Sequence, residues 1–207
     1  GLSVVQEMLR SGWTTVRILG DADVAYAHLD VRTAIREGLF AGPRLTGAGH
    51  YFSITGGGGD LNFIAPEHAV AGDGLVVDGV DAARKAVREE IKHGSDWIKV
   101  LASGAMMSAG NDPNRAHFSP EELRAIVEEA SRLGVPVAAH AHSDAGIRAA
   151  LLAGARTIEH GTFISDDSLK LMREKGVYLV PTLYVGDYYL NEQPGSEAQA
   201  KMNELTR

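Results

Sequence analysis

The sequence predicts an α/β fold, a (β/α)8 barrel of the TIM type present as a partial barrel of about six βα units, strands two to seven. The first observation is a repeated order of amphipathic helix, glycine and apolar run, with the glycine at Gly12, Gly38, Gly94, Gly134, Gly154 and Gly176. The second is that several of these runs end in polar side chains. A doubly wound sheet fits the same order, and the polar strand ends favour the barrel.

The third observation is the length of the chain. A closed barrel of this kind typically takes about 250 residues, whereas this chain has 207. We therefore expect residues 1–207 to form a single barrel domain that is incomplete at both ends, by roughly one βα unit each.

Local signals place the individual elements. Strands are expected at residues 14–19, 43–46, 97–101, 135–142, 157–161 and 177–183. Helices are expected at residues 1–10, 31–37, 80–92, 120–133, 144–153, 165–175 and 197–207. Residues 119–122 (SPEE) are a strong helix start, because a Ser cap precedes Pro and a Glu follows three residues after the cap. Further helix starts are expected at Asp30, Ser143 and Ser165. The glycine-rich region 47–79 is expected to be a long functional loop.

Composition excludes several classes of site. The chain has no cysteine, which rules out disulfides, thiolate metal sites and a Cys nucleophile. Its net charge of −7 and the absence of a basic run argue against a nucleic-acid partner. No apolar run approaches the roughly 20 residues of a membrane helix, and no signal peptide is visible. We expect a cytoplasmic protein with a small-molecule substrate, and self-association into a homo-oligomer is left open.

Three residues at equivalent strand ends are candidates for a metal site: Lys99, His140 and His160. Carboxyl ends of parallel strands meet on one face, so these side chains should converge, and neutral imidazoles are good ligands for Zn²⁺. A lysine inside an apolar strand is costly to bury as an ammonium, and the neutral amine can react with carbon dioxide to give a carbamate that bridges two metal ions. The alternatives are histidines bonded to backbone carbonyls and a lysine paired with a carboxylate.

Eight segments together resemble the amidohydrolase superfamily, in particular the subgroup of metal-dependent Xaa-Pro dipeptidases and imidazolonepropionase-like hydrolases. They cover nearly the whole chain in order: TTVRILG (14–20), GPRLTGAG (42–49), ITGGGGD (54–60), WIKVLASG (97–104), FSPEELRAIVEEA (118–130), AAHAHSDAGI (138–147), IEHGTF (158–163) and VPTL (180–183). Each motif alone is weak, whereas the combination is specific.

The resemblance implies a metal-dependent hydrolase of carbon–nitrogen bonds that cleaves a small amide or dipeptide, such as Xaa-Pro, by metal-activated hydroxide. It implies that Lys99 is the carboxylated bridging ligand and that His140 and His160 bind a second divalent ion, with zinc expected. His142 is the position at which relatives contact substrate. A ring-opening or deaminating hydrolase on the same scaffold and a catalytically inactive binding module remain alternatives.

The chain departs from the family pattern at three places. The His-x-His pair of strand one and the Asp of strand eight have no counterpart in this chain, so we expect the chain alone to be inactive or nearly so. Relatives often carry His where this chain has Gly58.

Three further residues are candidates for contacting substrate. Arg17 could bind a carboxylate or form a structural ion pair. Tyr184 could line the pocket, and His50 follows a strand end. The remaining histidines are expected in loops or at the surface: His28, His68, His93 and His117.

Overall fold

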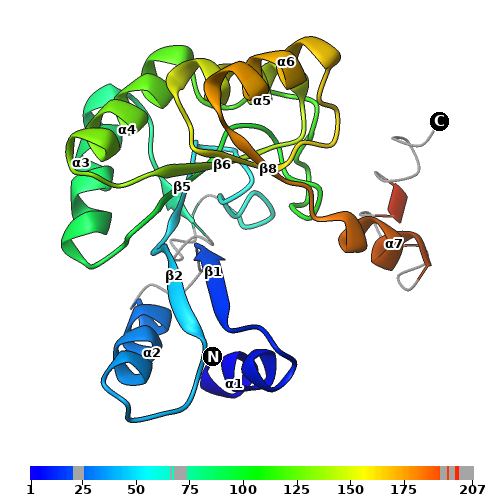
Figure 1. The fold of residues 1–207 in the computed structure, drawn as a ribbon. Helices are drawn as coiled ribbons and strands as arrows, with labels where there is room; N and C mark the ends of the chain where they lie inside the picture. Colours follow the sequence, from blue (N-terminus) through cyan, green and yellow to red (C-terminus); the bar gives the residue numbers. More distant parts are fainter. Residues whose placement is uncertain (21–25, 66, 68–73, 192–194, 196–198, 201–207) are drawn as a thin grey trace.

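The computed structural model describes residues 1–20, 26–65, 67, 74–191, 195 and 199–200 (Figure 1). The helices are α1 (Leu2–Arg10), α2 (Ala27–Arg36), α3 (Val80–Lys92), α4 (Pro120–Arg132), α5 (Asp144–Ala153), α6 (Asp166–Lys175) and α7 (Leu183–Asn191). The strands are β1 (Thr15–Leu19), β2 (Arg44–Ala48), β3 (Tyr51–Ser53), β4 (Leu75–Val76), β5 (Ile98–Leu101), β6 (Val137–Ala141), β7 (Thr157–His160) and β8 (Tyr178–Val180). None of the helices in these residues is long and apolar enough to cross a membrane.

The strands form two parallel sheets. One has the order β1-β2, and the other has the order β4-β3-β5-β6-β7-β8. The Gly47 carbonyl at the end of β2 accepts hydrogen bonds from the backbone N–H groups of Asp96 (3.0 Å) and Trp97 (3.1 Å), which connects the smaller sheet to the entry of β5. Helices α3 to α6 lie along one side of the larger sheet, and α1 and α2 accompany β1 and β2 (Figure 1).

The core lies between the larger sheet and its helices. Strands β5, β6 and β7 are nearly all buried, as expected of parallel strands covered by crossover helices. Their outward side chains pack on the apolar faces of α3 to α6, through residues such as Val100, Val87, Ile126, Ile147 and Met172. This packing holds the carboxyl ends of the three strands in register with one another.

Helix caps account for several of the predicted boundaries. The Ser119 hydroxyl accepts the Glu122 N–H (3.2 Å), and the Glu122 carboxylate accepts the Ser119 N–H (2.8 Å), so the predicted capping box is confirmed. Ser143 and Ser165 also cap their helices through their side chains. At the other end, Gly154 adopts a left-handed φ of 99°, which an L side chain rarely takes.

All six predicted strands are present, and three local predictions are wrong. Asp30 does not cap α2, because the helix starts three residues earlier after Tyr26, whose hydroxyl is tied to Glu90 of α3 (2.8 Å). The last strand ends at Val180, and the chain turns into α7 from Leu183. The glycine-rich region contains the short strands β3 and β4. The predicted helix 197–207 lies outside the described residues except for residues 199 and 200, and the single-domain assignment stays a prediction.

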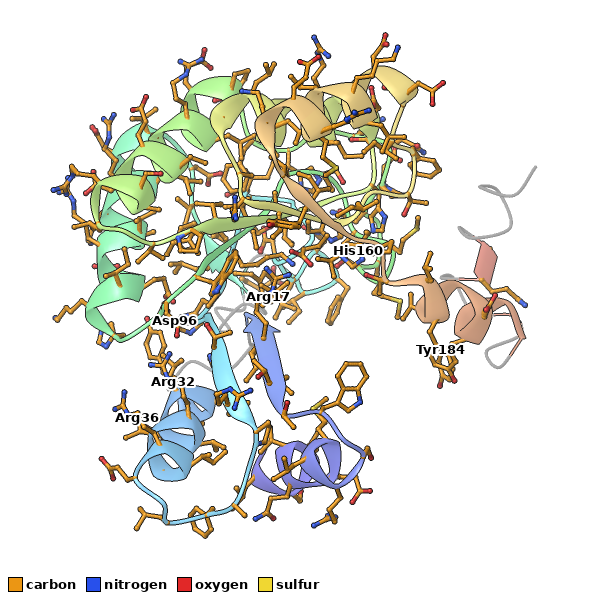
Figure 2. All side chains as sticks on the ribbon, in the orientation of Figure 1. Arg17, Arg32, Arg36, Asp96, His160 and Tyr184 are labelled. Atoms are coloured by element: carbon orange, nitrogen blue, oxygen red, sulfur yellow. The ribbon has the colours of Figure 1, made fainter. Side chains whose placement is uncertain are left out.

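An ion pair crosses the interior of the partial barrel. Arg17 on β1 donates to both carboxylate oxygens of Glu159 on β7 (2.9 and 3.1 Å) and to the Thr157 hydroxyl (3.2 Å). The same guanidinium lies 4.6 Å from the ring centroid of Trp97. Strands β1 and β7 are not neighbours in either sheet, so the contact shows that the strands curve around a shared interior (Figure 2).

We predict that Arg17→Leu destabilises the chain strongly, because it leaves the buried Glu159 carboxylate without its cation. Breaking a buried pair in this way typically costs about 3–5 kcal/mol. The control is Lys85→Ala, since Lys85 forms only an exposed pair with Glu89 (3.5 Å), and such pairs contribute about 1 kcal/mol or less. Urea unfolding measures both; similar small losses would show that the crossing pair does not stabilise the barrel.

A second prediction concerns pH. Hydrogen bonds from Arg88 and then Arg132 lower the pKa of Glu129 to about 2, which ties α3 to α4. The unfolded chain therefore binds more protons than the folded chain as pH falls from about 4.5 to 2. The contribution of Glu129 to stability is full above pH 4.5 and is lost through that window.

Glu129→Gln should therefore be less stable than the wild type at pH 7 and equal to it near pH 2. Glu128→Gln is the matched control, because Glu128 is exposed and lies 3.8 Å from Arg84. Thermal unfolding across this pH range gives the comparison, and a constant difference between Glu129→Gln and wild type would contradict the prediction.

Candidate metal centre

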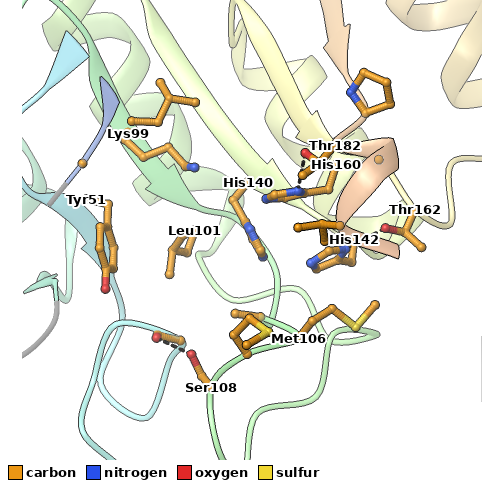
Figure 3. A pocket seen from close by; sticks show the side chains of 18 of the residues that line it. Tyr51, Lys99, Leu101, Met106, Ser108, His140, His142, His160, Thr162 and Thr182 are labelled. Carbon is orange, nitrogen blue, oxygen red and sulfur yellow. Dashed lines mark hydrogen bonds between the residues drawn. The ribbon is translucent and has the colours of Figure 1, made fainter. Parts of the chain in front are cut away.

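Three histidines from two neighbouring strands meet at one point. His140 lies in β6, His142 follows the end of β6, and His160 is the last residue of β7. Their ring centroids are 4.6, 4.7 and 4.9 Å apart. Each ring offers one nitrogen, and these three nitrogens all lie within 4.8 Å of one another (Figure 3). The geometry is that of a group able to hold one metal ion.

Lys99 lies on β5 beside this cluster and lines the same pocket. It is only 7% exposed, and no carboxylate in the described part of the chain lies within ion-pairing distance of its Nζ. Desolvation lowers the pKa of Lys99 to about 8. The negative charge of Glu159 acts against this by raising the pKa, and the positive charge of Arg17 lowers it further. A substantial fraction of the amine is therefore neutral in mildly alkaline solution.

Hydrogen bonds decide which ring nitrogen is available. His140 Nε2 lies 3.0 Å from the Gly104 carbonyl. A carbonyl only accepts, so this nitrogen carries the hydrogen and Nδ1 has the free lone pair. In His142 and His160 the nitrogen with a hydrogen-bond partner is Nδ1. The Nδ1 of His142 lies 2.8 Å from the Thr162 hydroxyl, and the Nδ1 of His160 lies 2.9 Å from the Thr182 hydroxyl.

The imidazoles are neutral over the usual working range. Burial, followed by the neighbouring basic groups, lowers the pKa of His140 well below its ordinary value. Burial likewise lowers the pKa of His142 to about 4 and that of His160 to about 3. Neutral imidazole is the form that coordinates Zn²⁺ and similar ions, so the donor set fits a divalent metal.

The cluster opens into a pocket of about 610 Å³. Its polar groups include Lys99 on β5 and the three histidines on, or directly after, β6 and β7. The remaining wall is largely apolar and includes Leu19, Leu101, Met106, Met107, Leu179 and Val185. A volume of this size and a mainly apolar lining with a few convergent polar groups are typical of a small-molecule site.

Comparison with known proteins decides the family. A sequence model of the Amidohydrolase family matches residues 1–202. The chain belongs to the amidohydrolase family. The family is generally metal-dependent, which agrees with the histidine cluster described above.

Among curated proteins, the amidohydrolase chain is 38% identical over 217 aligned positions to an ochratoxinase of Aspergillus niger, covering 96% of this chain and 44% of that protein. The crystal structure of A. niger ochratoxinase superposes with a TM-score of 0.87 at 36% identity, covering 99% of this chain and 49% of that one. The crystal structure of a Xaa-Pro dipeptidase with bound methionine superposes with a TM-score of 0.90 at 33% identity, covering 98% of this chain and 52% of that one. The chain thus spans about half the length of these relatives, which confirms the predicted partial TIM-type barrel.

Three predicted substrate contacts are not among the described residues that line the amidohydrolase pocket. Arg17 is engaged by Glu159, which supports the structural ion-pair alternative. His50 follows the end of β2 as expected, but its Nδ1 lies 2.8 Å from the buried Glu90 carboxylate. Tyr184 is 76% exposed and points away from the pocket (Figure 2). Their role in substrate binding stays a prediction without support from the pocket geometry.

Two pocket residues that the sequence did not single out come from the glycine-rich region and the next loop. Tyr51 lines the pocket in the place expected for His50, because the chain re-enters a strand at this residue. Ser108 lines it and donates to the Gly58 carbonyl (2.6 Å), which joins the two loops. A Cβ on Gly58 would lie 2.9 Å from the Ala105 Cβ, so the two loops approach closely only because residue 58 is glycine.

We predict that His140→Ala lowers the zinc affinity of the chain by at least about tenfold, because it removes the free Nδ1 from the cluster. Competition with a chromophoric chelator measures the affinity. His93→Ala is the control, since His93 stacks on Tyr26 (4.7 Å) away from the pocket. Equal zinc affinities in the two variants would mean that the histidine cluster is not the metal site.

Proposed function

We propose that the protein carrying this chain is a metal-dependent hydrolase that cleaves a carbon–nitrogen bond of a small amide or dipeptide. The observation that supports it best is the meeting of three neutral imidazoles and a buried lysine in one pocket of an amidohydrolase-family chain. A divalent ion held there, with zinc expected, would polarise the substrate carbonyl and lower the pKa of bound water. His140 and His160 serve as ligands, and His142 serves as a substrate contact or as a third ligand.

Lys99 is proposed to carry a carbamate. The neutral Nζ attacks the carbon of carbon dioxide and loses one proton, which creates an anionic group with two oxygens. Its lowered pKa supplies the neutral amine, and the pocket supplies space beside the histidines. The carbamate would add an anionic oxygen ligand beside the histidines and, as the resemblance to the amidohydrolase superfamily implies, could be shared by two ions.

The favoured substrate class is a dipeptide with a C-terminal proline. Support comes from the likeness to the Xaa-Pro dipeptidase and to a prolidase complexed with N-methylphosphonate-L-proline, which superposes with a TM-score of 0.86 at 35% identity. The apolar wall of Met106, Met107 and Leu179 suits apolar groups beside the scissile amide. No arginine lines the pocket among the described residues, so the assays include substrates with and without a free carboxylate.

A substrate panel tests this proposal on the whole protein in which the chain occurs, loaded with zinc or manganese. It contains Xaa-Pro dipeptides, their C-terminal amides, N-acyl aromatic amino acids and cyclic amides. Preferential hydrolysis of Xaa-Pro supports the dipeptidase, and turnover confined to cyclic amides replaces it with a ring-opening hydrolase. Absence of both metal and turnover leaves the binding module as the better description.

We predict that Lys99→Ala lowers the metal content of the protein and abolishes turnover, because the bridging carboxylate is lost. Propionate or acetate at high concentration should restore part of both by occupying the vacated space. Elemental analysis and the assay of the best panel substrate give the two readouts. Lys85→Ala is the control on an exposed lysine, and an unchanged metal content in Lys99→Ala would mean that Lys99 has no ligand role.

A further inference from the structure

Two residues at neighbouring strand ends adopt backbone conformations that L residues rarely take. His160, at the end of β7, has φ 74°, and Thr182, just after β8, has φ 53°. The left-handed region is unfavourable for any side chain and is a genuine outlier for a β-branched one. In the described part of the chain, Tyr26 is the only other non-glycine residue with a positive φ. Such strain is commonly retained at functional sites, and here both residues line the pocket.

The two unusual conformations produce one contact. The Thr182 hydroxyl oxygen lies 2.9 Å from His160 Nδ1 (Figure 3). The same oxygen lies 3.4 Å from the carbonyl oxygen of Val180. A hydroxyl has one hydrogen and two acceptor positions, whereas a carbonyl can only accept. The hydroxyl hydrogen therefore has an acceptor in Val180 O, and the hydroxyl oxygen remains able to accept from the His160 ring.

Only one arrangement gives both hydrogens an acceptor within the described part of the chain. If Thr182 donates to Nδ1, the ring hydrogen sits on Nε2 and no lone pair of His160 faces the pocket. If Thr182 donates to Val180 O and accepts from Nδ1–H, both hydrogens are bonded and Nε2 keeps its lone pair. The second arrangement makes one hydrogen bond more, and a typical hydrogen bond contributes about 1 kcal/mol net.

We propose that Thr182 is a positioning residue that holds His160 in the Nδ1–H tautomer and so presents Nε2 to a divalent ion. Histidine ligands commonly donate their other N–H to a fixed acceptor, which sets the tautomer and the ring orientation. The metal-binding half of this inference rests on the proposed function, whereas the tautomer does not. Pro181 contributes by keeping Val180 extended, so that Thr182 is the first residue free to turn back toward His160.

His142 provides an internal comparison. Its Nδ1 lies 2.8 Å from the Thr162 hydroxyl, so a second threonine occupies the equivalent place on a second ring of the cluster. The rings of His142 and His160 are stacked 4.9 Å apart at 20°. Thr162→Val and Thr182→Val therefore remove the same group from the same ring atom of two adjacent histidines, and only the second should affect His160.

Long-range ¹⁵N–¹H spectra of the metal-free chain show which nitrogen of each neutral imidazole carries the hydrogen, with His160 assigned by comparison with His160→Gln. The wild type should show Nδ1–H at His160. Thr182→Val, which keeps the shape and the β-branch, should populate the Nε2–H tautomer, and Thr182→Ser, which keeps the hydroxyl, should restore Nδ1–H. Thr162→Val should leave the His160 signals as in wild type.

Zinc affinity, measured by competition with a chelator, is the second readout. Thr182→Val should bind zinc about 10–100-fold more weakly, as is typical when the hydrogen-bond partner of a ligand is removed, and Thr182→Ser should stay near wild type. An Nε2–H tautomer in the wild type would overturn the proposal without any variant. So would a Thr182→Val chain that keeps Nδ1–H and wild-type zinc affinity, or a Thr182→Ser chain that loses the tautomer. If the wild type binds no zinc, the proposed metal site fails, and the spectra still decide the role of Thr182.

Discussion

Four basic side chains share one pocket that shields them from water, and this burial disfavours their charged forms. Lys99, His140 and His142 are buried, and His160 is partly buried. Desolvation is the first cause of the lowered pKa in each of them, and mutual repulsion of the charged forms adds to it in the histidines. The result is a set of neutral imidazoles whose lone pairs are free for a divalent cation. The capacity of the histidine cluster to hold a metal ion therefore depends on burial as well as on the choice of residues.

A second charge arrangement lies in the barrel interior next to Lys99. Glu159 raises the pKa of Lys99, and Arg17 lowers it. Because Arg17 and Glu159 are bonded to each other, their opposite effects on the lysine largely cancel, and desolvation decides its state. The same ion pair joins β1 to β7. Arg17 thus connects the two sheets, and it is not among the described residues that line the pocket.

The fold and the central residues of the site could be predicted because they depend on local patterns and on one topological rule. Parallel strands end on the same face, so His140 and His160 meet at the ends of β6 and β7. Lys99 lies two residues before the end of β5 instead of at its end, and its side chain still lines the same pocket. Partner choice could not be predicted in the same way. Arg17 and Glu159 are 142 positions apart in the sequence. The sequence alone therefore does not show whether Arg17 pairs with a carboxylate of the protein or with one of a substrate. Tyr184 points away from the pocket because the chain turns at the left-handed Thr182 and enters α7 instead of continuing as a strand.

The pocket divides its two tasks between different parts of the chain. The groups able to bind metal stand on, or directly after, strands β5, β6 and β7, which the packed core holds in place. Most of the wall that would touch the rest of a substrate comes from loops and from the start of α7, including Met106, Met107 and Val185. Loops tolerate substitution far better than packed strands. Relatives named for an ochratoxinase and for a Xaa-Pro dipeptidase match this chain at nearly the same identity, 36% and 33%. The pocket wall therefore comes mainly from the parts of the chain that the core packing constrains least.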